Sequence, residues 1–241
     1  MIDAGAAQTA PVTPSPSGGV AVEEVAKYAF ATGAQFALVV LFFRLLDLLP
    51  LAQAPAWAVA PVFTFLSLRS RVFSCLDNRR PDRAAQGGAA TPAEVKRPAW
   101  TPPGKVFPII WSTITVLRSM AGALAWEASG KSFLSPPILA LALHLCVGDT
   151  WNTVTNVERR LGTSFALVLL VLASVYYAVW RMYLAEPLAG FVLAPSAAWI
   201  SVATVLTGAI WRHNTPCQPL WPVRGDGKAS AMRLPFTSWN R

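Results

Sequence analysis

Six apolar segments constrain this sequence more than any other feature. Each is about 20 residues long, which is the length that an α-helix needs to cross the hydrocarbon core of a bilayer. Lipid offers no water to the backbone, so every peptide N–H and C=O in such a segment must be bonded within the protein, as an α-helix does. The sequence therefore predicts an all-α, polytopic membrane helical bundle with helices at Tyr28–Leu49, Ala54–Val72, Val106–Trp126, Pro137–Val157, Thr163–Tyr183 and Leu188–Trp211.

The composition and the breaks between segments agree with this class of protein. Hydrophobic residues make up 54% of the 241 residues and charged residues 13%, which is too apolar for an ordinary soluble domain. Between the first two segments, Pro50 and Pro55 indicate a tight helical hairpin, because proline breaks the hydrogen-bond ladder of a helix; one long kinked helix is the alternative. Residues 1–27, which begin with a stretch rich in Ala, Pro, Ser and Thr, are predicted to form a disordered tail.

Positively charged residues indicate how the helices are oriented. If six helices alternate, the N-terminus, the loop from Arg69 to Lys105, the turn at Glu158–Arg160 and the C-terminal tail share one side and hold most of the Lys and Arg residues. Only Arg44, Lys131 and Arg181 lie near the opposite ends. This asymmetry predicts that both termini lie on the cytosolic or stromal side. It also explains the net charge of +8 without a nucleic acid partner, since no basic run is interleaved with aromatic residues.

Charged residues inside the apolar segments are candidates for function. Arg118 lies in the middle of the third segment and Asp149 in the fourth. A charge at that depth is costly and usually faces a partner or the bundle interior, so one hypothesis pairs Arg118 with Asp149, and the other places Arg118 against another subunit or a lipid carbonyl. Glu158, beside two arginines, is interpreted as part of a solvated turn. The cysteines have no metal-site spacing and are interpreted as packing residues or reduced thiols: Cys75, Cys146 and Cys217.

A tryptophan-rich stretch, RPAWTPPGKVFPIIW, leads into the third segment at residues 97–111. Pro102 and Pro103 keep the chain stiff and extended, so Trp100 is presented by a rigid loop at the membrane surface. There it is either an interfacial anchor or a contact for a ligand. Trp111 follows inside the helix.

Further aromatic residues and one histidine recur on other segments. His144 and Trp151 are seven residues apart and share a face of the fourth segment, and Trp199, Ala203 and Trp211 recur along the sixth. Aromatic planes around a common interior would suit a flat, largely apolar ligand. Spacing alone favours core packing as the explanation.

Taken together, these motifs resemble the TspO/MBR family of tryptophan-rich sensory proteins and translocator proteins, also called peripheral benzodiazepine receptors. The resemblance rests on RPAWTPPGKVFPIIW, LALH ending at His144, VWRMYLAEPLAGFVLAP and AAWISVATVLTGAIWRHN, in that order. It implies a five-helix TspO-type core at residues 54–214, one additional N-terminal transmembrane helix at residues 28–53 and a C-terminal tail at residues 215–241. The family's first loop folds over a cavity, and its ligands include porphyrins and other tetrapyrroles, sterols and synthetic aromatic drugs.

The resemblance also implies roles for individual residues. Trp100 stands at the family's loop tryptophan, Trp111 at its second-helix tryptophan, and Trp199 and Ala203 at pocket positions of the last helix. The departures from the family pattern are Lys105 in place of Trp, Thr115 in place of Tyr, Arg118 and Ser119 in place of Met-Gly, His144 in place of Asn, and Gly208 in place of the sterol-motif Tyr.

His144 has two interpretations. A neutral imidazole can be the axial ligand of a haem iron or a chlorophyll magnesium, or it can hydrogen-bond to a neighbouring helix. No paired carboxylates, GxSxG, HExxH or P-loop occur in the sequence, so we do not expect an enzyme.

The leading hypothesis is therefore an integral membrane protein that binds a tetrapyrrole (porphyrin, haem or chlorophyll-type) or a sterol-like molecule for sensing, transport or storage, with no obligatory cofactor. The alternative is a structural or assembly subunit of a larger membrane complex, such as a photosynthetic one; a homodimer is compatible with either. A small-solute transporter is a third hypothesis, disfavoured because no inverted repeat is visible. The divergent sequence and extra helix indicate a plastid membrane, with a mitochondrial or other organellar membrane as the alternative.

Overall fold

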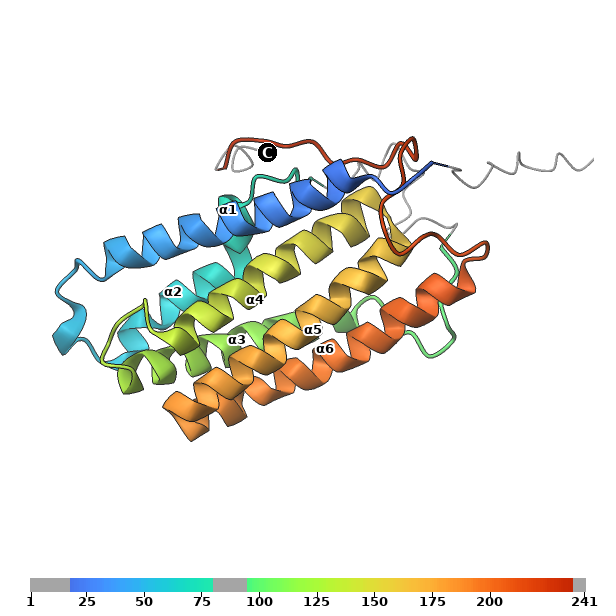
Figure 1. Cartoon of the computed structure of the whole chain (residues 1–241). Coiled ribbons are helices and arrows are strands. Elements are labelled where there is room, and N and C mark those ends of the chain that lie inside the picture. The colour runs from blue at the N-terminus through green and yellow to red at the C-terminus, as the bar shows by residue number, and fades with distance from the viewer. Residues whose placement is uncertain (1–17, 80–94, 236–241) are drawn as a thin grey trace, which may run out of the picture.

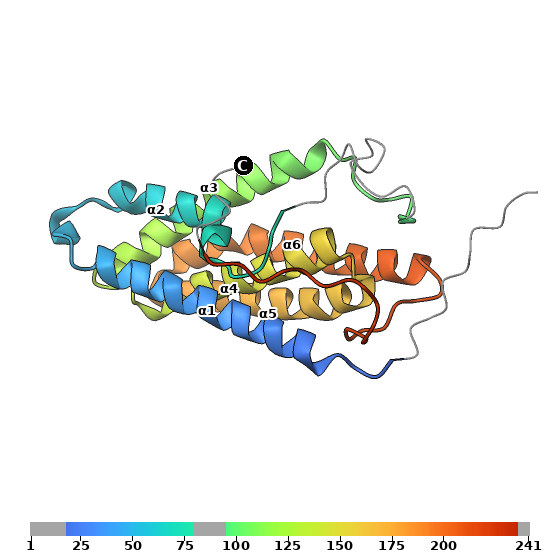
Figure 2. The same ribbon diagram turned by 90° about the horizontal axis from the view of Figure 1, so that it is seen from above.

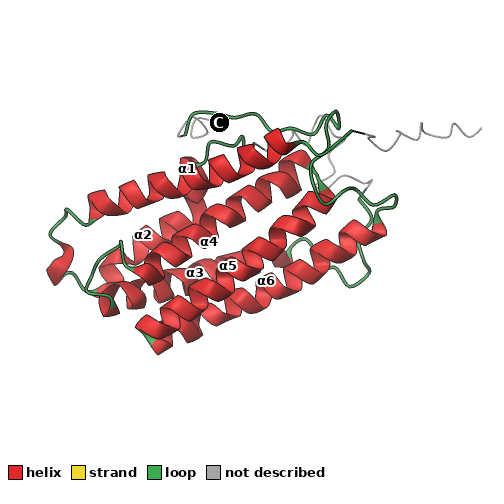
Figure 3. Cartoon of the chain, in the orientation of Figure 1, coloured by secondary structure: helices red, strands yellow, loops and turns green. Residues whose placement is uncertain are grey.

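The protein is a bundle of six α-helices in a computed structural model that describes residues 18–79 and 95–235 (Figure 1, Figure 3). Extended pairing within these residues is limited to two isolated bridges. All six predicted segments are helical, which confirms the all-α membrane bundle. The helices are α1 (Val22–Leu46), α2 (Ala56–Arg69), α3 (Val106–Ala128), α4 (Pro136–Thr153), α5 (Leu161–Ala185) and α6 (Pro187–His213).

The first helix is longer than the apolar segment that predicted it. α1 begins at Val22, within the residues assigned to the disordered tail, and Glu23 and Glu24 occupy its first turn. Carboxylates at this end of a helix are favoured by the helix dipole, although they interrupt an apolar run. Residues 1–17 of that predicted tail lie outside the described residues.

α1 and α2 form the predicted helical hairpin. α1 ends at Leu46, a short 3₁₀ turn, η1, covers Leu51–Gln53, and α2 begins directly after Pro55. The two helices run in opposite directions (Figure 1), so the alternative of one long kinked helix is wrong.

The helices differ in their capacity to span a bilayer. Four are long and apolar enough by length and composition: α1, α3, α5 and α6. α2 has only 14 residues before it continues into a 3₁₀ turn, η2 (Ser70–Phe73). α4 has 18 residues and is packed against α1, α3 and α5, and most of its polar side chains are buried. The expectation of six similar spans therefore holds for four helices.

An aromatic cluster joins α1 to the rest of the bundle. Phe133, in the α3–α4 loop, is fully buried. Its ring centroid lies 5.6 Å from that of Phe43 on α1 and 5.8 Å from those of Phe63 on α2 and Trp126 on α3. The backbone N–H of Phe133 donates to the carboxylate of Asp47 over 2.8 Å. The cluster thus fastens the α1–α2 hairpin to the end of α3.

The C-terminal segment folds back over the bundle. It runs along α1 after leaving α6 (Figure 1) and forms isolated bridges from Val223 to Val20 and from Met232 to Leu76. At the start of α5 the segment approaches Gly162 so closely that a Cβ there would lie 2.1 Å from the carbonyl oxygen of Pro219. The described part of the predicted C-terminal tail is therefore packed against the helices.

A buried charge cluster holds this segment in place. α4 continues into a π-type turn, η4 (Val154–Glu158), and the Glu158 carboxylate accepts hydrogen bonds from the hydroxyls of Tyr28 and Ser230. Arg160 is 4% exposed and lies 3.1 Å from both Glu158 and Asp226. The interpretation of Glu158 and its neighbours as a solvated turn is wrong, because the C-terminal segment covers them.

Candidate ligand cavity

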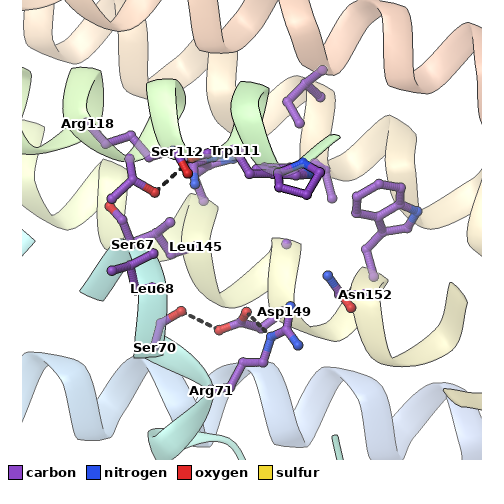
Figure 4. A pocket seen from close by; sticks show the side chains of 17 residues that line it. Ser67, Leu68, Ser70, Arg71, Trp111, Ser112, Arg118, Leu145, Asp149 and Asn152 are labelled. Atoms are coloured by element: carbon purple, nitrogen blue, oxygen red, sulfur yellow. Dashed lines mark hydrogen bonds and ion pairs between the residues drawn. The ribbon is translucent and has the colours of Figure 1, made fainter. Parts of the chain in front are cut away.

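A cavity of about 380 Å³ lies where α3 diverges from the bundle. Seen from above, α3 crosses the other helices obliquely and its N-terminal end lies apart from α4 and α5 (Figure 2). The lining comes from the end of α2 with η2, the first half of α3 and the second half of α4 (Figure 4). α5 and α6 contribute one residue each, Val171 and Ile200.

Two of the predicted tryptophans line this cavity. Trp111 comes from α3 and Trp151 from α4. The indole N–H of Trp151 donates to the Ser164 hydroxyl over 3.1 Å, which fixes the orientation of its ring. The cavity therefore offers two aromatic surfaces from different helices, although the spacing of the tryptophans alone had favoured core packing.

Asp149 is held by the α2–η2 connection and by α1. Its carboxylate accepts hydrogen bonds from the Ser70 hydroxyl at 2.5 Å and the Gln35 amide at 2.8 Å, and it pairs with the Arg71 guanidinium at 3.2 Å (Figure 4). Both Asp149 and Arg71 line the cavity. The partner of Asp149 is thus Arg71, and the predicted pair with Arg118 is wrong.

Arg118 contacts His144 instead. Its side chain is 6% exposed, lines the cavity and places Nη2 2.8 Å from Nε2 of His144. A guanidinium group only donates hydrogen bonds, so Nε2 must be the accepting, unprotonated nitrogen. The imidazole proton then lies on Nδ1, which is 3.0 Å from the Ser174 hydroxyl on α5. His144 is therefore neutral and hydrogen-bonds to both α3 and α5, as one of its two interpretations predicted.

The other predicted site residues lie outside the cavity lining. Trp199 packs edge-on against Phe107, with ring centroids 6.0 Å apart, and the neighbouring Ile200 faces the cavity in its place. Ala203, one turn further along α6, is half-buried and does not line the cavity.

The proline-rich loop is docked at the end of α6. The side-chain amide of Asn214 exchanges two 2.9 Å hydrogen bonds with the backbone of Lys96. Trp100 is 51% exposed, and neither it nor Pro102 and Pro103 line the cavity. The loop does not close over the cavity in this structure.

Sequence reasoning missed the contribution of α2 and η2. Ser67, Ser70 and Arg71 line the cavity. All three fall within the predicted helix Ala54–Val72, but none was singled out as a site residue, and Arg71 was counted only among the cations of the positive side. The 3₁₀ turn continues the helix by four residues and carries Arg71 to Asp149. No sequence pattern marked this turn.

Comparison with known proteins agrees with this architecture. The model of the TspO/MBR family matches residues 82–212, more than half of the chain. Protein CrtK of Rhodobacter capsulatus is 28% identical over 52% of this chain and 79% of its own length. Translocator protein 2 of Mus musculus is 27% identical over 64% of this chain and 93% of its own, and the tryptophan-rich sensory protein of Cereibacter sphaeroides is 26% identical over 50% and 74%. The chain therefore belongs to the TspO/MBR family.

Proposed function

We propose that this membrane protein binds a flat, largely apolar ligand of the tetrapyrrole class in the cavity between α2, α3 and α4, for sensing, transport or storage. The observation that carries the proposal is the convergence of Trp111 and Trp151 on one cavity together with a few polar groups. Aromatic walls and a small number of placed polar groups are typical of small-molecule sites. Binding rather than catalysis is proposed.

The size of the cavity limits how the ligand is held. A volume of about 380 Å³ lies at the low end of the range for small-molecule sites, about 300–1,000 Å³. A planar molecule of tetrapyrrole size can insert one edge between the indole rings of Trp111 and Trp151. The rest of the molecule would then extend out of the cavity beside α3. The Trp100 loop is the segment that would cover this remainder if it moved.

Fluorescence titration with protoporphyrin IX tests the proposal. Purified protein in detergent is expected to show saturable quenching of its tryptophan fluorescence. Trp111→Phe or Trp151→Phe should weaken binding by about two- to tenfold, because an aromatic contact is worth about 0.5–1.5 kcal/mol. Trp180→Phe is the matched control, since Trp180 lies on α5 and is largely exposed. Absence of saturable quenching in the wild type would refute the proposal.

We do not propose His144 as an axial metal ligand. Its Nε2 lone pair accepts from Arg118 and its Nδ1 faces Ser174, so ligation would require the first of these bonds to open. Free-base porphyrin and haem should therefore bind with similar affinity.

A sterol-like ligand is less well supported, because Gly208 replaces the tyrosine of the family's sterol motif. At Gly208 a Cβ would lie 2.8 Å from the ring of Phe165, which stacks on Trp211 with centroids 5.3 Å apart. The Phe165 ring thus fills the space beside Gly208, where the family's tyrosine would project.

We further propose that both termini lie on one membrane face. The described start of the chain pairs with the C-terminal segment through the Val20–Val223 bridge at the end of the bundle where α1 begins, and the C-terminal segment then runs along α1 (Figure 1). The proposal also rests on the sequence, which puts most Lys and Arg residues on the side of the termini if the helices alternate, as the positive-inside rule expects. Protease protection of the tail in sealed vesicles tests this sidedness. The plastid location stays a prediction, and a fluorescent fusion tests it.

The alternative of an assembly subunit lacks a specific observation in its favour. It was based on the additional helix, the long tail and the substitutions at Lys105, Thr115 and Gly208. The first two features make contacts within the chain. Gln35 of α1 bonds to Asp149 of α4, and Ser230 of the tail bonds to Glu158. Native gels after mild solubilisation would still reveal a stable homodimer or larger complex.

A further inference from the structure

We infer that the cavity is built for an acidic ligand, and that Arg118 binds a carboxylate at the edge of the planar molecule. The inference rests on the proposed function and specifies the chemistry of its ligand. Nothing in the family resemblance assigns this role, since Arg118 stands where the family has methionine.

The charges around the cavity do not balance. Arg71 is neutralised by Asp149, which lies 3.2 Å from it. Arg118 contacts only the neutral imidazole of His144, and none of the ion pairs found between described residues includes it. Asp149 also attracts Arg118 from beyond ion-pair distance. With two arginines and one aspartate, the lining still carries one net positive charge.

A second buried arginine, Arg160, is paired with carboxylates. Arg160 is buried to a similar degree, and it lies 3.1 Å from the carboxylates of both Glu158 and Asp226. A buried cation without a partner is strongly unfavourable, so arginines at such depth are usually paired. The contrast indicates that the partner of Arg118 arrives with the ligand.

Unused hydrogen-bonding atoms lie in the same place. Nε of Arg118 and the hydroxyl of Ser67 are both buried without a hydrogen-bond partner, and both residues line the cavity (Figure 4). A guanidinium group presents its N–H donors in a planar fork that matches the two oxygens of a carboxylate. A carboxylate also brings the single negative charge that the lining lacks.

His144 and Ser174 position the guanidinium group. Because Nε2 of His144 accepts from Nη2, the guanidinium plane is fixed relative to α4. The Ser174 hydroxyl near Nδ1 donates in turn to the carbonyl oxygen of Val171, so the tautomer of His144 is set before the ligand binds. Such preorganisation lowers the cost of binding.

The test compares one macrocycle with and without its acid groups. Protoporphyrin IX and its dimethyl ester share the same ring system, but only the first carries carboxylates. We expect the wild type to bind the acid roughly tenfold to hundredfold more tightly than the ester, the range of a hydrogen bond to a charged group. Arg118→Gln should abolish this preference, and Arg118→Lys should retain part of it.

Two controls separate the possible failures. Arg181→Gln removes the same charge from α5, away from the cavity lining, and should keep the preference for the acid. Ester binding by Arg118→Gln at wild-type strength shows that the variant is folded.

Equal binding of acid and ester by the wild type would overturn the inference and leave the proposed function standing. Loss of both ligands in Arg118→Gln would also overturn it, because Arg118 would then shape the cavity rather than bind the acid. Binding of neither ligand by the wild type would refute the proposed function and the inference together.

Discussion

The Glu158 cluster is expected to hold the C-terminal segment on the bundle, and Glu158→Gln tests this with almost no change in shape. One carboxylate oxygen accepts from both the backbone N–H and the hydroxyl of Ser230, at 3.1 Å and 2.5 Å. The other accepts from the Tyr28 hydroxyl and lies 3.1 Å from Nε of Arg160. An amide NH₂ group would face an N–H group in either orientation, because the Ser230 backbone and the Arg160 guanidinium can only donate.

The size of the effect follows from these contacts. Removing one member of a buried ion pair costs about 3–5 kcal/mol when the other is left alone. Arg160 keeps Asp226 at 3.1 Å, so the loss should approach that of one hydrogen bond to a charged group, about 1.5–3 kcal/mol. We expect the free energy of unfolding to fall by about 2 kcal/mol.

Unfolding in detergent with increasing SDS, followed by circular dichroism, measures this change. Glu23→Gln is the control, because the pair of Glu23 with Arg224 is largely exposed and should contribute nothing measurable. Trypsin should also cleave the Glu158→Gln variant faster within residues 224–233. Equal stability and equal cleavage of the two variants would refute the role of the cluster.

Three further changes test other parts of the structure. Phe133→Ala should lower the free energy of unfolding by about 3–5 kcal/mol, since its ring contacts three others; a loss below about 1 kcal/mol would contradict this packing. Gly162→Val should loosen the C-terminal segment and speed its proteolysis, because a Cβ at position 162 would overlap Pro219. Gly33→Ala is the control: position 33 has open space around it, so proteolysis should be unchanged. His144→Ala should leave the absorption spectrum of bound haem unchanged. A shifted spectrum would instead support His144 as the axial ligand of the haem iron.

The helices could be predicted because membrane burial leaves few alternatives. A run of about 20 apolar residues must satisfy its own backbone, so its presence nearly determines an α-helix. Pro50 and Pro55 marked the hairpin for a similarly local reason. The start of α1 was missed because Glu23 and Glu24 end the apolar run, although they suit the first turn of a helix.

The cavity was only partly predictable. The spacing of His144 and Trp151 placed them on one face of α4, and the structure brings Trp111 to the same cavity. Spacing within a helix does not determine which neighbour faces it, so the pairings of Arg118 with His144 and of Asp149 with Arg71 could not be distinguished from the predicted pair. Burial of Glu158 depends on residues more than 60 positions away, which no local pattern reveals.

The most direct test of the ligand site is an experimental structure of the protein with protoporphyrin IX. We predict density for one edge of the macrocycle between Trp111 and Trp151, with a propionate at the guanidinium group of Arg118. Density for the ligand elsewhere, for example beneath the exposed Trp100 loop, with the cavity between α2, α3 and α4 empty, would contradict the proposed site.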